Sequence, residues 1–261
     1  MNTIDIQRSA SIFNPTPYMP TIHVIGVGAT GSHIWDQLTC LGYHNMVAWD
    51  FDRIEPHNLN NQTYLEQHIG MRKVRALRYM TKQKAPSTNY QYMPLKVTAE
   101  TIKKYSHLFK ESIIVLAIDT MAGRKELGKL FHERIDIKFM VEPRIASKHC
   151  NVYALPITSP LQYQQWYDTL GDDDDPIYET SPCGGSISVK PTITLASSLC
   201  VWAIIDWINE KAYDFGTNAF VSPSSIGYVT HDKKYKEQRS EFSDANLFRN
   251  SINRLWTQPP A

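Results

Sequence analysis

The residues Gly26-Val27-Gly28-Ala29-Thr30-Gly31 match the pattern G-x-G-x-x-G and offer the clearest chemistry in the chain. They follow a short β-branched segment and open an amphipathic one, so a strand should lead into the turn and a helix out of it. Small residues let the backbone approach a phosphate, and a helix N-terminus supplies unpaired N–H groups and the positive end of a dipole. The pattern predicts a phosphate-binding loop formed by Gly26, Gly28, Ala29, Thr30 and Gly31.

Asp50 extends this prediction to a whole nucleotide. It stands at the end of the next predicted strand, Met46–Trp49, where a carboxylate can accept hydrogen bonds from ribose hydroxyls. The glycine turn and this acid indicate a nucleotide without indicating which one. Two other interpretations stay open here. A nicotinamide or flavin enzyme would use the same motif, and the glycines could serve only close packing of helix on strand, with Asp50 capping a turn.

The segment VAWDFDRIEPHNLNNQ, followed by Gly70-Met71-Arg72-Lys73, distinguishes between these interpretations. It resembles the ThiF/MoeB family of ubiquitin-activating-enzyme-like adenylyltransferases, whose pattern runs D-x-D-x-(V/I)-x-x-x-N-L-x-R-Q and then G-x-x-K. The similarity continues at Val115–Thr120, with Arg124 shortly after, and more faintly at Thr192–Ile208. The positions that match the first pattern are Asp50, Asp52, Asn58, Leu59, Gln62, Gly70 and Lys73.

The resemblance implies an ATP site in which a carboxylate attacks the α-phosphate. Such a site must offset the negative charge of both reactants. Lys73 can reach the phosphates as a mobile ammonium, and Asp119 can hold Mg²⁺ through its oxygens. Each has a plainer alternative, because Lys73 could be a solvated lysine at a helix start and Asp119 could cap a helix that begins at Met121.

Four polar side chains complete the implied nucleotide site. By resemblance, Asp50 would hold the ribose of ATP, and Asp52 would lie beside the nucleotide. The amides of Asn58 and Gln62 can donate hydrogen bonds to phosphate oxygens without adding charge.

One motif position departs from the family. Asn61 stands where the family has an arginine that reaches the nucleotide of the partner subunit in a dimer. An amide cannot replace a permanently charged guanidinium, so either another residue substitutes or adenylylation is slower. The candidate substitutes are Arg8, Arg72 and Arg144.

The cysteines raise two separate questions. Many relatives bind zinc through two CxxC pairs, and this chain has none, with Tyr163 in the region of the first pair, so no zinc is expected. Cys183, in Ser-Pro-Cys-Gly-Gly, resembles the place where some members carry a reactive cysteine. Its thiolate could accept the activated acyl group, or it could be a buried, inert thiol. Cys200, inside an apolar helix, is expected in the core.

The elements that must position these residues follow from hydrophobic periodicity. Strands alternate with helices, which predicts a Rossmann-like, doubly wound, mostly parallel sheet with an antiparallel C-terminal extension. The expected strands are Thr21–Gly26, Met46–Trp49, Tyr90–Leu95, Ser112–Ile118, Lys138–Val141 and Asn151–Leu155, and the expected helices are Ser32–Leu41, Lys73–Lys84, Ala99–Phe109, Arg124–Arg134 and Ile193–Asn209.

We expect one adenylating domain over residues 1–261. Residues 1–155 would form its nucleotide-binding core, residues 156–192 a mobile crossover loop with the acidic run Asp172–Asp175, and residues 193–261 a closing helix and polar tail.

Composition excludes several other classes. With 42% hydrophobic and 20% charged residues the chain should fold, and 27 Lys and Arg against 26 Asp and Glu produce no overall field toward nucleic acid or anionic lipid. The longest apolar segment, Leu195–Ile208, is interrupted by polar residues, so no membrane span is expected. The N-terminus lacks the apolar core of a signal peptide, which predicts a cytoplasmic protein with reduced thiols.

The sequence thus favours ATP-dependent adenylylation of the C-terminal carboxylate of a small ubiquitin-like protein or peptide, possible thiol transfer at Cys183, and a homodimer. The dimer also draws on the apolar helix around Trp202 and Trp207, although these side chains could equally fill the core. A catalytically weakened ATP-binding regulator is the first alternative, because of Asn61, and a nicotinamide-dependent oxidoreductase is the second.

Overall fold

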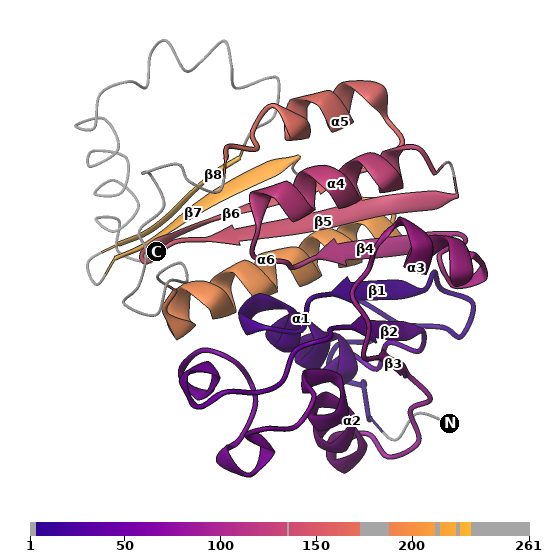
Figure 1. Cartoon of the computed structure of the whole chain (residues 1–261), viewed down its shortest axis with the longest axis vertical. Helices are drawn as coiled ribbons and strands as arrows, with labels where there is room; N and C mark the ends of the chain where they lie inside the picture. The colour runs from indigo at the N-terminus through magenta and orange to yellow at the C-terminus, as the bar shows by residue number, and fades with distance from the viewer. Residues whose placement is uncertain (1–3, 135, 173–187, 212–214, 223–224, 231–261) are drawn as a thin grey trace, which may run out of the picture.

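Eight strands form one mixed sheet in the computed structural model, which describes residues 4–134, 136–172, 188–211, 215–222 and 225–230 (Figure 1). The strands are β1 (Ile22–Ile25), β2 (Met46–Trp49), β3 (Gln91–Met93), β4 (Ser112–Leu116), β5 (Ile137–Ile145), β6 (His149–Leu155), β7 (Gly216–Ser222) and β8 (Ser225–Thr230). Their order in the sheet is β3-β2-β1-β4-β5-β6-β7-β8.

Helices pack on both faces of this sheet. They are α1 (Ala29–Cys40), α2 (Lys73–Lys84), α3 (Ala99–Lys104), α4 (Met121–His132), α5 (Pro160–Tyr167) and α6 (Lys190–Ile208), with short 3₁₀ turns at Pro56–Asn60, Glu66–His68 and Ser106–Leu108. One buried cluster joins the sheet to α1, α2 and α6, and the other joins it to α3, α4 and α5. Both faces are therefore covered, as a parallel sheet requires.

The first five strands run parallel and reverse their winding at β1. From β1 the chain moves outward to β2 and β3, and then it crosses back to β4 on the other side of β1. In such sheets ligands bind where the carboxyl ends of the two strands diverge. That point lies between Gly26, after β1, and Ala117–Asp119, after β4.

The last three strands confirm the antiparallel extension. β5 pairs antiparallel with β6, β6 with β7 and β7 with β8. The sequence predicted β6, two residues short, but it did not predict β7 or β8. The doubly wound fold with its antiparallel extension is thus as expected.

Two other elements differ from the expectation. The segment expected to be one long loop contains α5, whose N-cap Ser159 accepts a hydrogen bond from the amide of Gln162 and is followed by Pro160 at the first helical position. Helix α4 begins at Met121 instead of Arg124, and Thr120 is its N-cap, accepting from Gly123 N at 3.3 Å. Asp119 is therefore not the cap.

Helix α6 is long and apolar enough to cross a membrane, by length and composition alone. Its residues Ile193, Ala196, Cys200 and Ile204 are buried beside α1 and the sheet, and 44% of its 18-residue apolar window is buried. A core helix meets the same criteria. Within this helix, Trp207 stacks on Phe139 with ring centroids 5.1 Å apart, whereas Trp202 is half exposed.

His23 of β1 illustrates how fully the sheet is covered. The indole Nε1 of Trp49 donates to its Nδ1 at 2.9 Å, which leaves Nε2 to donate to the carbonyl of Leu108 at 2.8 Å. Burial lowers the pKa of His23 to about 4. The imidazole is therefore a neutral core group with both nitrogens satisfied.

Candidate active site

The glycine turn connects β1 directly to α1, and two of its glycines are required by packing. Gly26 has φ +85°, and a Cβ built on it would lie 2.4 Å from the carbonyl oxygen of Ala117. A Cβ on Gly31 would lie 1.9 Å from the carbonyl oxygen of Gly26. Both clashes are with backbone, so these two positions admit no side chain. The packing interpretation thus holds for Gly26 and Gly31.

Gly28 differs from its two neighbours in the motif. The nearest atom to a Cβ built there is Nε2 of Gln62, 4.0 Å away. Gly28 is the N-cap of α1, and among the described residues no side chain caps this helix or places an acid in its first turn. The N–H groups that begin at Ala29 and Thr30 are therefore available to an anion at this turn.

Asp50 lies at the end of β2 with only 6% of its surface exposed. Its Oδ2 accepts from Val27 N at 2.9 Å, and its Oδ1 accepts from Asp52 N at 2.8 Å. Burial raises the pKa of this carboxyl, while Lys73 and the two amide donors oppose the rise. Each oxygen keeps acceptor capacity, so the carboxylate can also receive hydroxyl donors.

Lys73 is buried beside two acids, which excludes the interpretation of a solvated lysine. Its Nζ donates to Oδ2 of Asp52 at 2.9 Å and lies 4.0 Å from Oδ2 of Asp50. Its backbone N–H also donates to the carbonyl of Asp52 at 3.0 Å. The motif residues Asp50, Asp52 and Lys73 therefore form one charged group at the carboxyl end of β2.

The loop between β2 and α2 brings the motif amides to the glycine turn. Asn58 is buried, and its Oδ1 accepts from Glu55 N at 2.9 Å, so its side chain shapes the loop. Gln62 is also buried, yet its Oε1 has no hydrogen-bond partner among the described residues. Tyr64, which the sequence analysis missed, donates from its hydroxyl to the carbonyl of Val27 at 2.7 Å. Of the two amides, Gln62 is the one left open toward a ligand.

Asp119 follows β4 and is exposed. Because β4 and β1 are parallel neighbours, its loop meets the glycine turn, as the approach of Ala117 to Gly26 confirms. The described residues contain no group of three or more His, Cys, Asp or Glu side chains that could hold a metal ion. A single carboxylate suits Mg²⁺ that completes its coordination with phosphate oxygens and water.

The three arginines considered as substitutes for the motif arginine lie in different settings. Arg144 is buried and paired with Glu142, so it is not available to a triphosphate, and this candidate was wrong. Arg72 is exposed at the N-cap of α2 and donates to the carbonyl of Phe51. Arg8 is exposed in the N-terminal segment.

Position 61 contacts the start of α6. Nδ2 of Asn61 donates to Oγ of Ser188 at 3.0 Å, and Nε2 of His33 lies 3.3 Å from its carbonyl oxygen. Burial and the charge of Lys190 lower the pKa of His33. Lys190 is thus the cation of α6 nearest this corner, and the sequence pattern gave no signal for it, since it lies far from the motif in the chain.

Two of the other cysteines lie in the core of the described part of the chain. Cys183 lies outside the described residues. Burial raises the pKa of Cys150 to about 11 and that of Cys200 well above its usual value, so both are core thiols. His57 is exposed, with its Nδ1 3.5 Å from Oε2 of Glu55. Tyr163 of α5 stacks on His132 of α4.

Comparison with known proteins gives a family and a fold. A model of the ThiF family matches residues 20–246. The ubiquitin-like modifier-activating enzyme 5 of Caenorhabditis elegans is 36% identical over 117 residues, which are 45% of this chain and 24% of that protein. The Xenopus laevis protein of the same name is 26% identical over 87 residues, 33% of this chain and 21% of that protein. The chain thus matches only about a quarter of these relatives' length or less.

Solved structures extend the likeness over most of the sheet. PaaA superposes with a TM-score of 0.61 at 14% identity, covering 82% of this chain and 72% of PaaA. Escherichia coli MccB with ATP superposes with a TM-score of 0.60 at 13% identity, covering 82% of this chain and 63% of MccB. MccB has also been crystallised with AMPCPP and MccA. At these identities the likeness confirms the Rossmann-like fold.

Proposed function

The chain belongs to the ThiF family, and we propose that it is an ATP-dependent adenylyltransferase that activates the C-terminal carboxylate of a small ubiquitin-like protein or peptide. The observation that carries this proposal is the charged group in which buried Asp50 and Lys73 meet half-exposed Asp52, beside Gly28, where an added Cβ would meet no atom nearer than 4.0 Å. Sequence relatives named as ubiquitin-like modifier-activating enzymes support the substrate class. MccB with ATP, and with MccA, supports the nucleotide and a peptide-type acceptor.

The residues of the site fit ATP. The carboxylate of Asp50 would accept the ribose hydroxyls, and the N–H groups that follow Gly28 would face the phosphates. Gln62 has a buried amide whose oxygen finds no partner within the described part of the chain and whose nitrogen is the nearest atom to an added Cβ at Gly28. A polar ligand in this space would relieve the cost of that unpaired group.

Lys73 would supply the charge compensation for the reaction. A carboxylate oxygen of the acceptor attacks the α-phosphorus of ATP, a new P–O bond forms, and the bond to the β-phosphate oxygen breaks, so that pyrophosphate leaves with the electron pair. Negative charge accumulates on the phosphoryl oxygens in this step. The ammonium of Lys73, held 2.9 Å from Asp52, would exchange part of that ion pair for the phosphates.

Asp119 would hold the divalent cation that accompanies ATP. When bound, Mg²⁺ neutralises phosphate charge and polarises the phosphoryl group. The exposed carboxylate after β4 lies at the same edge of the sheet as the glycine turn, and one protein carboxylate is a sufficient ligand when phosphates supply others.

The wider biology of the chain is part of this proposal. We infer a cytoplasmic homodimer that needs no zinc and contacts neither nucleic acid nor membrane. Cys183 would take over the acyl group as a thioester if the reaction continues beyond the adenylate. An ATP-binding regulator with weakened catalysis is the second candidate, because Asn61, in place of the motif arginine, is bound to Ser188.

Nucleotide preference tests the proposal first. Mg-ATP should raise the unfolding temperature more than NADH at equal concentration, and Lys73→Met should abolish most of that rise. Lys84→Met is the matched control, because Lys84 lies on the same helix and pairs with an acid, Asp36, on the surface. A larger shift with NADH would exclude the adenylyltransferase.

Turnover separates the enzyme from the regulator. Labelled ATP and candidate acceptor proteins should yield pyrophosphate and an acyl-adenylate, and Asp119→Ala should prevent both. Binding of ATP with no turnover by any acceptor would favour the regulator.

A further inference from the structure

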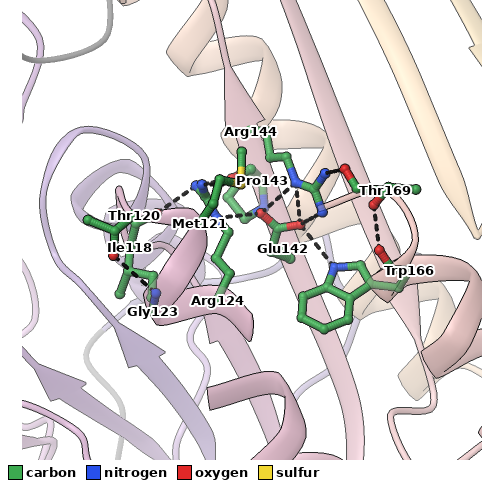
Figure 2. Close-up of polar contacts among 10 residues, drawn as sticks. All are labelled: Ile118, Thr120, Met121, Gly123, Arg124, Glu142, Pro143, Arg144, Trp166 and Thr169. Carbon is green, nitrogen blue, oxygen red and sulfur yellow. Dashed lines mark hydrogen bonds and ion pairs between the residues drawn. The ribbon is translucent and has the colours of Figure 1, made fainter. Parts of the chain in front are cut away.

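Glu142, in the middle of β5, is a carboxylate with 0% of its surface exposed. Figure 2 shows it between the guanidinium groups of Arg124 and Arg144. Nε of Arg124 lies 2.7 Å from Oε1, and Nε and Nη2 of Arg144 each lie 2.8 Å from Oε2. The indole of Trp166 donates to Oε2 at 3.0 Å. Among the described residues Nε of Arg124 has no hydrogen-bond partner, so its contact with Oε1 is an ion pair, whereas Nε of Arg144 donates to the acid. Glu142 is therefore the shared counter-charge that holds both guanidiniums beside it.

The other side of each guanidinium holds a backbone carbonyl. Nη2 of Arg124 donates to the carbonyl of Ile118 at 2.6 Å and contacts that of Pro143 at 3.4 Å. Nη1 of Arg144 donates to the carbonyl of Thr169 at 2.7 Å. The two arginines that pair with Glu142 thus also hold backbone carbonyls, and Arg124 holds that of Ile118, the residue before Asp119.

The loop that carries Asp119 is short and is fixed at both ends. Before it, Ala117 N donates to the carbonyl of Ile25 at 2.9 Å, which continues the pairing of β1 with β4. After it, Thr120 caps α4. Between these points the contact from Arg124 fixes the peptide that joins Ile118 to Asp119 (Figure 2). The direction of that peptide sets the direction of the Cα–Cβ bond of Asp119, from which the exposed carboxylate extends.

We propose that Arg124, oriented by Glu142, is a positioning residue for Asp119: it holds the Ile118 carbonyl so that the Asp119 carboxylate faces the divalent cation bound to ATP. The inference rests on the proposed function, since it assigns a support to the proposed cation ligand. A buried ion pair need not add stability, so a positional role accounts for keeping two guanidiniums around one acid in the core.

The geometry requires an arginine at position 124. A guanidinium is a rigid plane that spreads its charge over three nitrogens, so Arg124 can lie against Glu142 while its Nη2 donates to the carbonyl of Ile118. A lysine has a single ammonium at the end of a flexible chain, which could keep the charge but could not hold both partners in fixed directions. Arg124→Lys therefore keeps the positive charge of the cluster and removes the orientation.

The test is the dissociation constant of ATP, measured by calorimetry on the full chain with Mg²⁺ and again with EDTA. The ratio of the two constants reports the cation contribution. In Arg124→Lys this ratio should fall about tenfold, as for other supports of metal ligands, while the affinity in EDTA stays within about twofold. Arg134→Lys is the matched control, because Arg134 pairs with Asp136 before β5, at the opposite edge of the sheet.

Each outcome decides the proposal. An unchanged ratio in Arg124→Lys overturns it, and so does an equal loss of affinity with and without Mg²⁺, which is what a merely structural role would produce. If Arg124→Lys does not fold, the double variant Arg124→Met/Glu142→Gln carries the same prediction, since it removes opposite charges together and leaves an acceptor for Arg144.

Asp119→Asn separates this inference from the proposed function. If the parental protein and Asp119→Asn show the same ratio, the cation site itself is wrong and the positioning role is rejected with it. If Asp119→Asn abolishes the cation contribution and Arg124→Lys does not, the proposed function stands and the positioning role alone is rejected.

Discussion

Asp50 and Glu142 are both buried acids of the same sheet, but their surroundings differ. Glu142 has two guanidiniums and an indole within hydrogen-bonding distance. Asp50 has two backbone amides and a lysine 4.0 Å away, and burial raises its pKa. We call Glu142 with Arg124 and Arg144 the closed group, because its charges face one another and hold backbone carbonyls. We call Asp50 with Lys73 and the glycine turn the open group, because its carboxylate keeps acceptor capacity for a ligand. The difference separates an acid enclosed by structural partners from an acid that, under the proposed function, binds the ligand.

The largest expected effect is on stability and separates the two acids directly. Glu142→Gln should lower the free energy of unfolding by about 3–5 kcal/mol, because it leaves buried guanidiniums without their counter-charge. Asp50→Asn should lower it by about 1–2 kcal/mol, because one backbone amide loses its acceptor. Urea denaturation measures both. Glu111→Gln, in a surface pair with Lys138, is the control. Equal losses at Glu142 and Asp50 would remove the distinction.

Acid titration extends the comparison to His23, which is as closed as Glu142. The folded state holds this imidazole neutral with a pKa of about 4 against an ordinary 6.5. The contribution of His23 to the free energy of unfolding is therefore complete above pH 6.5 and is lost as the pH falls to about 4. The loss amounts to about 3 kcal/mol. Asp50 acts in the opposite direction, because a raised carboxyl pKa favours the folded state as the pH falls.

Urea denaturation at a series of pH values checks this prediction. His23→Gln should flatten the loss of stability between pH 6.5 and 4, and Asp50→Asn should make it steeper. A parental slope that His23→Gln leaves unchanged would show that another group controls the acid transition.

The glycine turn contains the same contrast on a smaller scale. Gly31→Ala places a methyl group against the carbonyl of Gly26 and should cost about 1–3 kcal/mol. Gly28→Ala meets nothing nearer than 4.0 Å, so its stability should change by less than about 0.5 kcal/mol while ATP binding weakens. Denaturation and calorimetry on both variants measure the two quantities. If Gly28→Ala binds ATP with parental affinity, the open space at this turn is not the phosphate site.

The sequence predicted the open group far better than the closed one. Gly28 belongs to the glycine turn, and Asp50 and Lys73 belong to the second family pattern. The structure brings these segments together, because Asp50 accepts from Val27 N in the turn and lies 4.0 Å from Nζ of Lys73. Glu142 was not identified at all, and Arg144 was one of three candidates to replace the motif arginine. Glu142 and Arg144 are neighbours on one face of β5, but the contact of Glu142 with Arg124 depends on how α4 packs on the sheet, which local periodicity does not encode. Strands β7 and β8 were missed for a similar reason, since each depends on its neighbour in the sheet.

The smallest expected effect comes from restoring the family arginine. Asn61 is partly buried beside Ser188, at the edge of the open group. Asn61→Arg loses one neutral hydrogen bond and should cost about 1 kcal/mol or less, because an added cation there can face solvent or phosphate. A cation added beside Glu142, Arg124 and Arg144 would have neither solvent nor a free acid to face.

The gain from Asn61→Arg should depend on the phosphates of the ligand. A guanidinium at position 61 that meets a triphosphate should tighten ATP binding a few-fold, in line with about 1 kcal/mol for a partly exposed charge contact, and should leave AMP binding unchanged. Calorimetry with the two nucleotides, with Asn61→Gln as an uncharged control, measures the difference. Equal tightening for ATP and AMP would place the new charge near the adenosine, and no change for either would mean that position 61 lies outside the phosphate site. In both cases the ligand-binding group would consist of Gly28, Asp50, Gln62 and Lys73. Another cation would then have to replace the family arginine, and Lys190, which begins α6 and acts on His33 beside position 61, is the candidate from that helix.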